Sequence, residues 1–368
     1  MESNTIRKVS QENRPPDSHG GDRWAAQARW GIAADQFLDF SASINPLGPP
    51  AYVMQAIQDQ LHRLEYYPEP AGMVLKRALA EYLQLDGEHI VLGNGSVELI
   101  YLCARMFGRK RVIVLAPGFT EYGQGLEHPS VIQVALNLSH MRLPLEELAG
   151  ILAAGDLLFI NNPNNPTGNL FCREELLQLL ELVNARQAKL VLDEAFIDFV
   201  GEPNASLRDI SGQESLIILG SLTKFFALPG LRIGYALSSK ENISQMEKLL
   251  PPWRMNTLAL IAGVSAVQDR EYIEKTLALI AGEREFIISE LKKIKGLEIY
   301  PSQANFVLVD ASERGIKAGE LQAKLGPEGI LIRDCGGFYN LSPYHLRLAV
   351  RGRIENQILI KTLRKVLD

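Results

Sequence analysis

Lys224 stands at the end of a short polar segment, 221–224, that follows the apolar run 216–219. A lysine that is partly removed from water loses its proton more readily, and its neutral amine can then form an imine with a carbonyl compound. The hydroxyls of Ser221 and Thr223, and the guanidinium of Arg232, are suited to a phosphate group. The segment therefore fits an imine-forming lysine beside a phosphate site. A surface lysine in a salt bridge is the alternative.

Asp193 directly follows the apolar run 190–192. It lies 31 residues before Lys224. A carboxylate at the end of a buried strand is costly unless it meets a cation, and a protonated ring nitrogen is one such cation. The alternative is that Asp193 caps the N-terminus of a helix.

Two further polar loops follow apolar runs. The loop 93–96 (Gly-Asn-Gly-Ser) precedes a helical stretch, so its backbone and the helix amides could bind a phosphate. It lacks the third glycine of a dinucleotide motif, and an ordinary turn before a helix explains it at least as well. The loop 161–168 is rich in Asn and Pro and presents amide side chains, or is a plain turn.

These polar segments must be positioned by the elements that precede them. Helical stretches, among them 49–64 and 72–85, alternate with strand-like runs at 90–92, 112–115, 157–160, 190–192, 216–219 and 233–237. Such alternation predicts an α/β domain with a mostly parallel sheet, in which ligands bind at the carboxyl ends of strands. A long helical stretch at 271–295 and strand-like runs at 297–300, 306–309, 330–333 and 346–350 predict a smaller α+β C-terminal domain.

The composition limits the class of protein. The chain has 368 residues, 46% of them hydrophobic, and a net charge of -5. This size favours two domains, and this charge gives no sign of nucleic-acid binding. The basic run 109–111 is interpreted as a solvated helix end. The three cysteines and six histidines show no metal-ligand spacing. With a polar start and no apolar stretch of membrane-spanning length, we expect a cytoplasmic protein without metal, membrane or nucleic acid.

In this order, the motifs resemble those of the fold-type I pyridoxal-phosphate enzymes, in the subgroup that contains histidinol-phosphate aminotransferase and threonine-phosphate decarboxylase. The resemblance runs from about His19 to the C-terminus. It implies an aspartate-aminotransferase-like fold and pyridoxal 5'-phosphate, held as a Schiff base by the catalytic Lys224. It also implies that Asp193 pairs with the ring nitrogen. The other cofactor contacts that it implies are Asn165 on the phenolic oxygen, Phe119 on the ring face, Phe196 beside the ring, and Gly95, Ser96, Ser221, Thr223, Arg232 and Tyr67 on the phosphate.

The resemblance also implies partners and a domain division. Tyr67 would reach the phosphate from a second subunit, which implies a homodimer. We expect an N-terminal segment, 1–48, that contributes to the substrate pocket, a large cofactor-binding domain, 49–265, and a small C-terminal domain, 266–368.

The same resemblance indicates a small phosphorylated amino acid as the substrate. Arg347 matches the arginine that binds the substrate carboxylate, a task suited to a guanidinium, and Arg333 matches one that meets the substrate phosphate. The segment 19–50 resembles the start of threonine-phosphate decarboxylases, where it forms part of the substrate pocket. Its candidate contacts are His19, Gly20 and Asn45, and Asn165 is a further one.

Phe196 bears on the reaction, because many aminotransferases of this fold have tyrosine at this position. The missing hydroxyl weakens the case for transamination, although an apolar pocket wall is an equally natural reason for phenylalanine. The resemblance thus favours decarboxylation of L-threonine O-3-phosphate to (R)-1-aminopropan-2-yl phosphate and carbon dioxide, in cobalamin biosynthesis.

Two other functions stay open. A histidinol-phosphate aminotransferase of histidine biosynthesis would use Lys224 to move a proton from Cα to the cofactor, and a 2-oxo acid would complete the cycle. A non-catalytic ligand-sensing protein on the same fold would carry a DNA-binding domain. The first 40 or so residues are not strongly basic and show no helix-turn-helix pattern, which argues against it.

Overall fold

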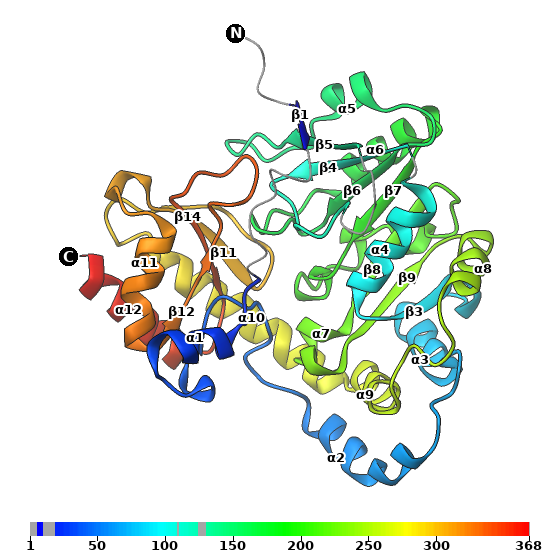
Figure 1. The fold of residues 1–368 in the computed structure, drawn as a ribbon, viewed down its shortest axis with the longest axis horizontal. Coiled ribbons are helices and arrows are strands. Elements are labelled where there is room, and N and C mark those ends of the chain that lie inside the picture. Colours follow the sequence, from blue (N-terminus) through cyan, green and yellow to red (C-terminus); the bar gives the residue numbers. More distant parts are fainter. Residues whose placement is uncertain (1–5, 10–18, 109, 124–129, 368) are drawn as a thin grey trace.

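The computed structural model describes residues 6–9, 19–108, 110–123 and 130–367. These residues form a large part built on one sheet and a smaller part that contains the C-terminal helices (Figure 1). The long helix α10 (Arg270–Leu291) contacts both parts: it packs on strand β11 (Phe306–Asp310) of the smaller part and on the turn Ile197–Phe199 of the larger one. This arrangement matches the predicted pair of a large sheet and a smaller α+β unit. The predicted boundaries stay a prediction, and helix α9 (Thr257–Gln268) runs across residue 265.

The large sheet has eight strands in the described part of the chain, in the order β1-β5-β4-β6-β7-β8-β9-β3. Neighbours from β5 to β8 pair in parallel, whereas β1, β9 and β3 pair antiparallel with their neighbours. A mostly parallel sheet is thereby confirmed. The strands are β1 (Ile6–Val9), β3 (Ile90–Asn94), β4 (Arg111–Ala116), β5 (Ser130–Ala135), β6 (Leu157–Asn161), β7 (Lys189–Asp193), β8 (Leu216–Ser221) and β9 (Ile233–Leu237).

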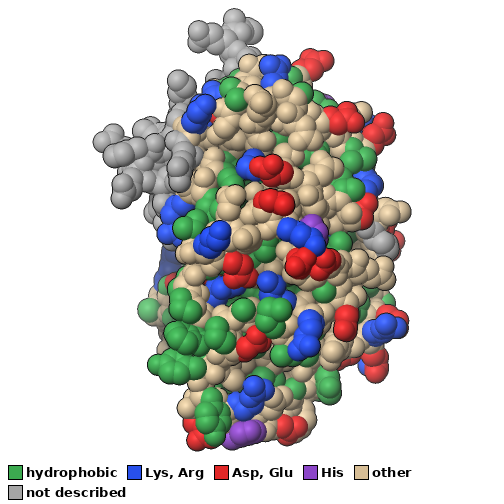
Figure 2. Space-filling view, turned by 90° about the vertical axis from the view of Figure 1, so that its right-hand side faces the viewer, with side chains coloured by type: hydrophobic (Ala, Val, Ile, Leu, Met, Phe, Trp, Pro, Cys, Tyr) green, Lys and Arg blue, Asp and Glu red, His purple; other side chains and the backbone are tan. Residues whose placement is uncertain are grey.

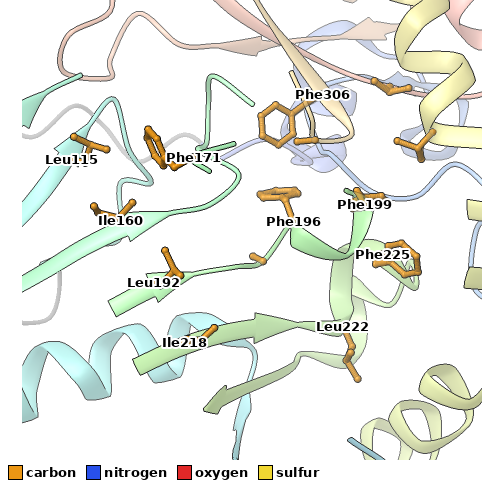
Figure 3. Packing of buried hydrophobic residues seen from close by; sticks show 14 of the residues in the cluster. Leu115, Ile160, Phe171, Leu192, Phe196, Phe199, Ile218, Leu222, Phe225 and Phe306 are labelled. Carbon is orange, nitrogen blue, oxygen red and sulfur yellow. The ribbon is translucent and has the colours of Figure 1, made fainter. Parts of the chain in front are cut away.

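Both faces of this sheet are buried, which explains why its central strands are continuous apolar runs. Alternate side chains point to opposite faces: Leu158 and Ile160 belong to one core cluster, and Leu157 and Phe159 to another. On one face, side chains of four neighbouring strands lie in a row (Figure 3). Helices α3 (Met73–Leu83), α6 (Arg173–Ala185) and α9 cover that face, and α4 (Ser96–Phe107) and α8 (Lys240–Leu249) cover the other.

The predicted helices 49–64 and 72–85 are confirmed as α2 (Ala51–Asp59), followed by a 3-10 turn, and α3. Of the basic run 109–111, interpreted as a helix end, residue 109 lies outside the described residues, and for Arg111 the interpretation is wrong. Helix α4 ends at Phe107, and Arg111 begins β4, where its Nε donates to Oδ1 of the buried Asp156 at 2.9 Å. Helices α5 (Leu145–Ile151) and α7 (Leu222–Phe225) complete the large part. Across the described residues, every helix is too short or too polar to cross a membrane.

The smaller part is an antiparallel sheet of β10 (Glu298–Ile299), β11 (Phe306–Asp310), β14 (His345–Ala349) and β13 (Arg333–Asp334), in that order. Helices α11 (Ala318–Leu325) and α12 (Arg353–Leu367) belong to this part. The run 330–333, predicted as one strand, is divided. Strand β12 (Ile330–Leu331) pairs in parallel with β2 (Leu38–Asp39) of the N-terminal segment, and only β13 joins the sheet.

The N-terminal segment packs on the smaller part. Ala26 of helix α1 (Arg23–Trp30) forms an apolar cluster with Phe37 and Leu331, and Trp30 packs against it. The backbone N–H of Phe40 donates to the carbonyl of Leu331 at 2.8 Å. The segment therefore enters the molecule beside β12 and β13, close to the predicted substrate residue Arg333.

Candidate active site

The carboxyl ends of β6, β7 and β8 meet at one pocket, as a parallel sheet requires. The start of α4 and the loop after β4 close its sides. The pocket brings together most of the predicted cofactor residues, and it is lined by Ser96, Val97, Phe119, Asn161, Asn165, Asp193, Ala195, Phe196, Thr223, Lys224 and Arg232.

Lys224 lies in the short helix α7, directly after β8. Burial lowers the pKa of its amine to about 8, and the positive charges of Arg232 and Arg347 act in the same direction, whereas Asp193 opposes them. A substantial fraction of this amine is therefore neutral near physiological pH. That is the state needed to attack a carbonyl group.

Asp193 is buried at the end of β7 and does not begin an α-helix. Tyr122 Oη donates to Asp193 Oδ2 at 2.7 Å, and the backbone N–H of Ala195 donates to Oδ1 at 3.0 Å. Burial raises the pKa of the carboxyl group, while these hydrogen bonds and Lys224 lower it. A cation placed against this carboxylate would lower its pKa further. The site therefore fits a protonated ring nitrogen.

Donors suited to a phosphate gather at the other end of the pocket. Gly95 has a φ of +82°, and a Cβ built there would lie 2.6 Å from Arg232 Nη2, so only glycine lets the guanidinium lie against the start of α4. The hydroxyls of Ser221 and Thr223 are 2.7 Å apart. Together with the first amides of α4, these groups form an anion site and fit the phosphate of the implied cofactor.

Aromatic rings form the walls of the pocket. The ring of Phe196 meets that of Phe306 edge-on, with centroids 4.9 Å apart, and Lys224 Nζ lies 5.3 Å from the centroid of Phe196. Figure 3 shows Phe196 beyond the end of β7, facing Phe306 of the smaller part. Phe119 meets Tyr122 edge-on at 5.8 Å. The apolar contact of Phe196 with Phe306 is itself a reason for phenylalanine at this position.

Arg347 reaches this pocket from β14 of the smaller sheet. Its Nη1 donates to Asn165 Oδ1 at 2.5 Å, and its Nη2 donates to the backbone carbonyl of Ser41 at 2.9 Å. Burial lowers the pKa of the guanidinium to about 10. Nε has no hydrogen-bond partner among the described residues. The predicted substrate residues Asn165 and Arg347 are therefore in direct contact. Arg347 is also bound by Ser41 of the N-terminal segment.

A second hollow lies between the N-terminal segment and the strands β12 and β13. Its volume of about 910 Å³ is in the range of small-molecule sites. Predicted substrate residues from both sides line it, namely His19, Gly20 and Arg333. Gly20 packs closely on Ser41, and the N–H of Gly21 donates to Ser41 Oγ at 2.8 Å. The structure thus brings Arg333 to His19 and Gly20, although more than 300 positions separate Arg333 from them in sequence.

Asn45 is not brought into the hollow. It is buried, and its Nδ2 donates to the carbonyl of Phe225 at 2.7 Å and to Thr276 Oγ1 at 2.8 Å. Its backbone N–H donates to the carbonyl of Lys224 at 3.1 Å. The prediction that Asn45 contacts the substrate is therefore not supported, because its amide is used to join the N-terminal segment to the loop that carries Lys224.

Tyr67 lies away from both sites of its own chain, with 84% of its surface exposed. Its ring lies 5.1 Å from that of Trp253, and it lines a groove of mixed polarity, whose apolar side chains include Val74, Leu260 and Ile261 and whose polar ones include Arg63 and Glu69. Figure 2 shows hydrophobic side chains gathered toward the lower end of one face of the molecule.

Among the residues that were not predicted from the sequence, Tyr122 and Glu121 contact predicted site residues. Tyr122 holds Asp193, and Glu121 accepts a hydrogen bond from Tyr101 Oη at 2.6 Å. Glu121 Oε1 also lies 2.9 Å from His19 Nε2. Glu121 and Tyr122 lie two and three positions after Phe119, and this proximity to a predicted residue was the available signal.

Comparisons with known proteins agree with this geometry. The family model for aminotransferase class I and II matches residues 35–363. The chain is 35% identical to the threonine-phosphate decarboxylase of Salmonella typhimurium over 95% of this chain and 96% of that protein. It resembles the crystal structure of histidinol-phosphate aminotransferase from Clostridium acetobutylicum with a TM-score of 0.84 and 32% identity, covering 89% and 98% of the two chains. For L-threonine-O-3-phosphate decarboxylase from Porphyromonas gingivalis, the TM-score is 0.79 at 26% identity, with the same coverage.

Proposed function

The chain belongs to the class I and II aminotransferase family of pyridoxal-phosphate enzymes, and from this premise we propose that it decarboxylates L-threonine O-3-phosphate. The products would be (R)-1-aminopropan-2-yl phosphate and carbon dioxide, and the reaction would serve cobalamin biosynthesis. The position of the N-terminal segment is the observation that carries this choice. The segment resembles that of threonine-phosphate decarboxylases, and it lies against Arg347 and opposite Arg333, where a substrate would bind.

Pyridoxal phosphate, when bound, supplies an electron sink for a breaking bond at Cα. The residues that we propose to hold it are those of the pocket. Asp193 would meet the ring nitrogen, Asn165 the phenolic oxygen, and Phe119 the ring face. The phosphate would be held by Gly95, Ser96, Ser221, Thr223 and Arg232, whose donors already converge at the start of α4.

Lys224 would attach the cofactor and then hold a proton close to Cα of the substrate. Its lowered pKa, about 8, suits both tasks, since the amine can be neutral for attachment and can still take up or give a proton near neutral pH. Arg347 would bind the substrate carboxylate, and its unpartnered Nε offers one donor without breaking the contacts to Asn165 and Ser41. His19 and Arg333 would meet the phosphate.

We also propose a homodimer in which Tyr67 reaches the phosphate site of the partner subunit. Its exposed position at a groove of the surface supports this role, because a second copy seated there would cover the groove and receive the phenol. Sedimentation of the purified protein should then give twice the mass of the 40.9-kDa chain. A monomer at micromolar concentration would contradict the proposal.

The reaction is tested with purified holoenzyme and threonine phosphate in the absence of any oxo acid. We expect sustained release of carbon dioxide, one molecule for each substrate consumed. The Lys224→Ala variant should lose about 10⁴-fold of the rate, the upper end of what a positioned acid–base group contributes, together with the visible absorbance of the lysine-bound cofactor. No carbon dioxide from the wild type would sink the proposal.

The second candidate is histidinol-phosphate transamination, which the similarity to the Clostridium structure favours. Both functions fit a phosphorylated substrate and Arg333. Incubation with histidinol phosphate and 2-oxoglutarate distinguishes them. Formation of glutamate, with no carbon dioxide from threonine phosphate, would replace the first function by the second.

A further inference from the structure

Glu121 is a buried carboxylate to which the proposed reaction gives no task. It is 8% exposed and lies in the loop after β4. One of its oxygens accepts a hydrogen bond from Tyr101 of helix α4 at 2.6 Å, and the other lies 2.9 Å from His19 Nε2. The ring of His19 also lies 6.1 Å from that of Phe119. Glu121 therefore joins His19 to the loop after β4 and to helix α4 of the large part.

The loop of Glu121 joins the two halves of the site. Its four consecutive side chains have different tasks: Phe119 lines the cofactor pocket, Thr120 lines the hollow, Glu121 meets His19, and Tyr122 donates to Asp193. A change in the position of Glu121 would thus move His19, whose side chain is half exposed at the rim of the hollow.

A carboxylate this close to an anion site is unexpected if only charge matters, because it repels a phosphate. The hollow already contains two carboxylates, Asp22 and Asp334, beside His19 and the guanidinium groups of Arg29 and Arg333. The contacts of Glu121 indicate another task. An imidazole that donates Nε2–H to Glu121 has one nitrogen left, and that nitrogen can donate to an anion only when both are protonated. A carboxylate partner orients such a ring, as it does for histidines that bind metals.

We propose that Glu121 is a positioning residue for the substrate phosphate, acting through His19. It holds the imidazole at the rim of the hollow so that the second ring nitrogen serves a phosphate monoester. The inference rests on the proposed function in one respect, namely that the substrate is phosphorylated. It predicts that removing a negative charge at position 121 weakens phosphate binding, whereas simple repulsion predicts the opposite.

The test compares two charge-removing variants in the holoenzyme, Glu121→Gln and Asp22→Asn. Asp22 lines the same hollow and caps helix α1, a role that asparagine fills equally well, so Asp22→Asn is a matched control. We expect Glu121→Gln to raise KM for threonine phosphate about fivefold, the size of a half-exposed ion pair, with kcat within about twofold. Asp22→Asn removes a charge that only repels the phosphate, so it should lower KM.

A double-mutant cycle separates positioning from a general structural effect. If Glu121 acts through His19, the double variant His19→Ala, Glu121→Gln should bind no worse than His19→Ala alone. Additive losses, or a Glu121→Gln variant that binds more tightly, would overturn the inference. Unchanged cofactor absorbance and melting temperature check that each variant is folded.

Binding of inorganic phosphate keeps this inference distinct from the proposed reaction. Trp24 and Trp30 line the hollow, so their fluorescence should report phosphate binding without turnover. One outcome is that the wild type binds phosphate and Glu121→Gln lowers the phosphate affinity, while neither protein decarboxylates threonine phosphate. In that outcome the proposed decarboxylation is wrong and the role inferred for Glu121 stands. If decarboxylation occurs but phosphate affinity does not depend on Glu121, the inference is wrong. A wild type that binds no phosphate also refutes it.

Discussion

The cofactor pocket and the substrate hollow are built in different ways. The pocket takes its polar side chains from neighbouring strand ends of one sheet, and Asp193, Ser221 and Thr223 are all buried. The hollow takes His19 from the N-terminal segment and Arg333 from the smaller part, and half of the His19 side chain is exposed. Sheet hydrogen bonds fix the first site, whereas packing between separate segments fixes the second.

This difference indicates that the positions of the cofactor residues are fixed by the sheet, whereas the substrate hollow can change more readily. Strand ends that are hydrogen-bonded in one register cannot shift independently, so the position of Lys224 relative to Asp193 is set by β7 and β8. The hollow depends on the contact of Gly20 with Ser41 and on the short pairing of β2 with β12. We infer that changes at the hollow alter substrate preference and leave the cofactor chemistry in place.

A buried ion cluster behind the pocket extends this contrast. Glu194 follows Asp193 and is fully buried, with Oε2 accepting from Arg208 Nε at 3.0 Å and from Ser206 Oγ at 2.7 Å. Arg208 Nη1 also donates to Asp198 Oδ1 at 3.1 Å. Burial raises the pKa of Glu194 to about 7, and Arg208 opposes that shift. The cofactor side is therefore supported by a cation that neutralises two carboxylates.

The largest effect is expected for Arg208→Ala. Removing one partner of a buried ion pair leaves an uncompensated charge, so the free energy of unfolding should fall by about 3–5 kcal/mol. Lys275→Ala is the control, because Lys275 pairs with Glu271 on the exposed surface of helix α10 and its loss should cost no more than about 1 kcal/mol. Urea denaturation measures both. Equal losses would show that the buried cluster does not support the cofactor side.

The next effect concerns the cost of keeping Lys224 in the pocket. Its pKa of about 8 lies below the ordinary 10.5, a difference that corresponds to about 3 kcal/mol. Below pH 8 the lysine is charged in both the folded and the unfolded state, so the folded state carries the whole penalty. Between pH 8 and 10.5 only the unfolded state keeps its proton, and the penalty disappears as the pH rises.

Lys224→Met should therefore make the cofactor-free protein about 3 kcal/mol more stable at pH 7, and this gain should vanish near pH 10.5. Chemical denaturation of wild type and variant across this pH range measures the gain. A gain that does not change with pH would mean that packing, and not charge burial, distinguishes the two proteins.

The contrast also explains what could be predicted from the sequence. Strands β6 to β9 were predicted to within about two residues because each is a continuous apolar run that ends in polar residues. The run 330–333 was predicted as one strand, yet its two halves pair with β2 and β14, and strand partners cannot be identified from a single run. Strand β5 was missed: its sequence, Ser-Val-Ile-Gln-Val-Ala, breaks the apolar run with a glutamine.

The same holds for the site. Lys224, Asp193 and Asn165 follow predicted strands, so local sequence was enough to place them together. Tyr122 was missed because its partner, Asp193, is 71 residues away. Asn45 was assigned to the substrate, whereas its partner Thr276 is 231 residues away and only the folded chain reveals it. Contacts between distant segments are the part that sequence patterns did not supply.

Gly20→Ala is expected to have the smallest effect of the three and to separate the two regions most directly. A Cβ at this position would lie 2.1 Å from the carbonyl oxygen of Ser41, so the segment that carries His19 must move away. Overpacking of this kind costs about 1–3 kcal/mol, which corresponds to an increase of about 5- to 150-fold in KM for threonine phosphate. The cofactor affinity and the absorbance of the lysine-bound cofactor should not change.

The control for this variant is Gly150→Ala, because a Cβ at Gly150 meets no atom within 4 Å and the residue lies in helix α5, away from both sites. Its kinetics should match the wild type. A loss of cofactor affinity in Gly20→Ala would mean that movement of Ser41 is passed through Arg347 to Asn165, since Arg347 donates to both. In that case the substrate hollow and the cofactor pocket would be coupled, and a change in substrate preference would also affect the cofactor chemistry.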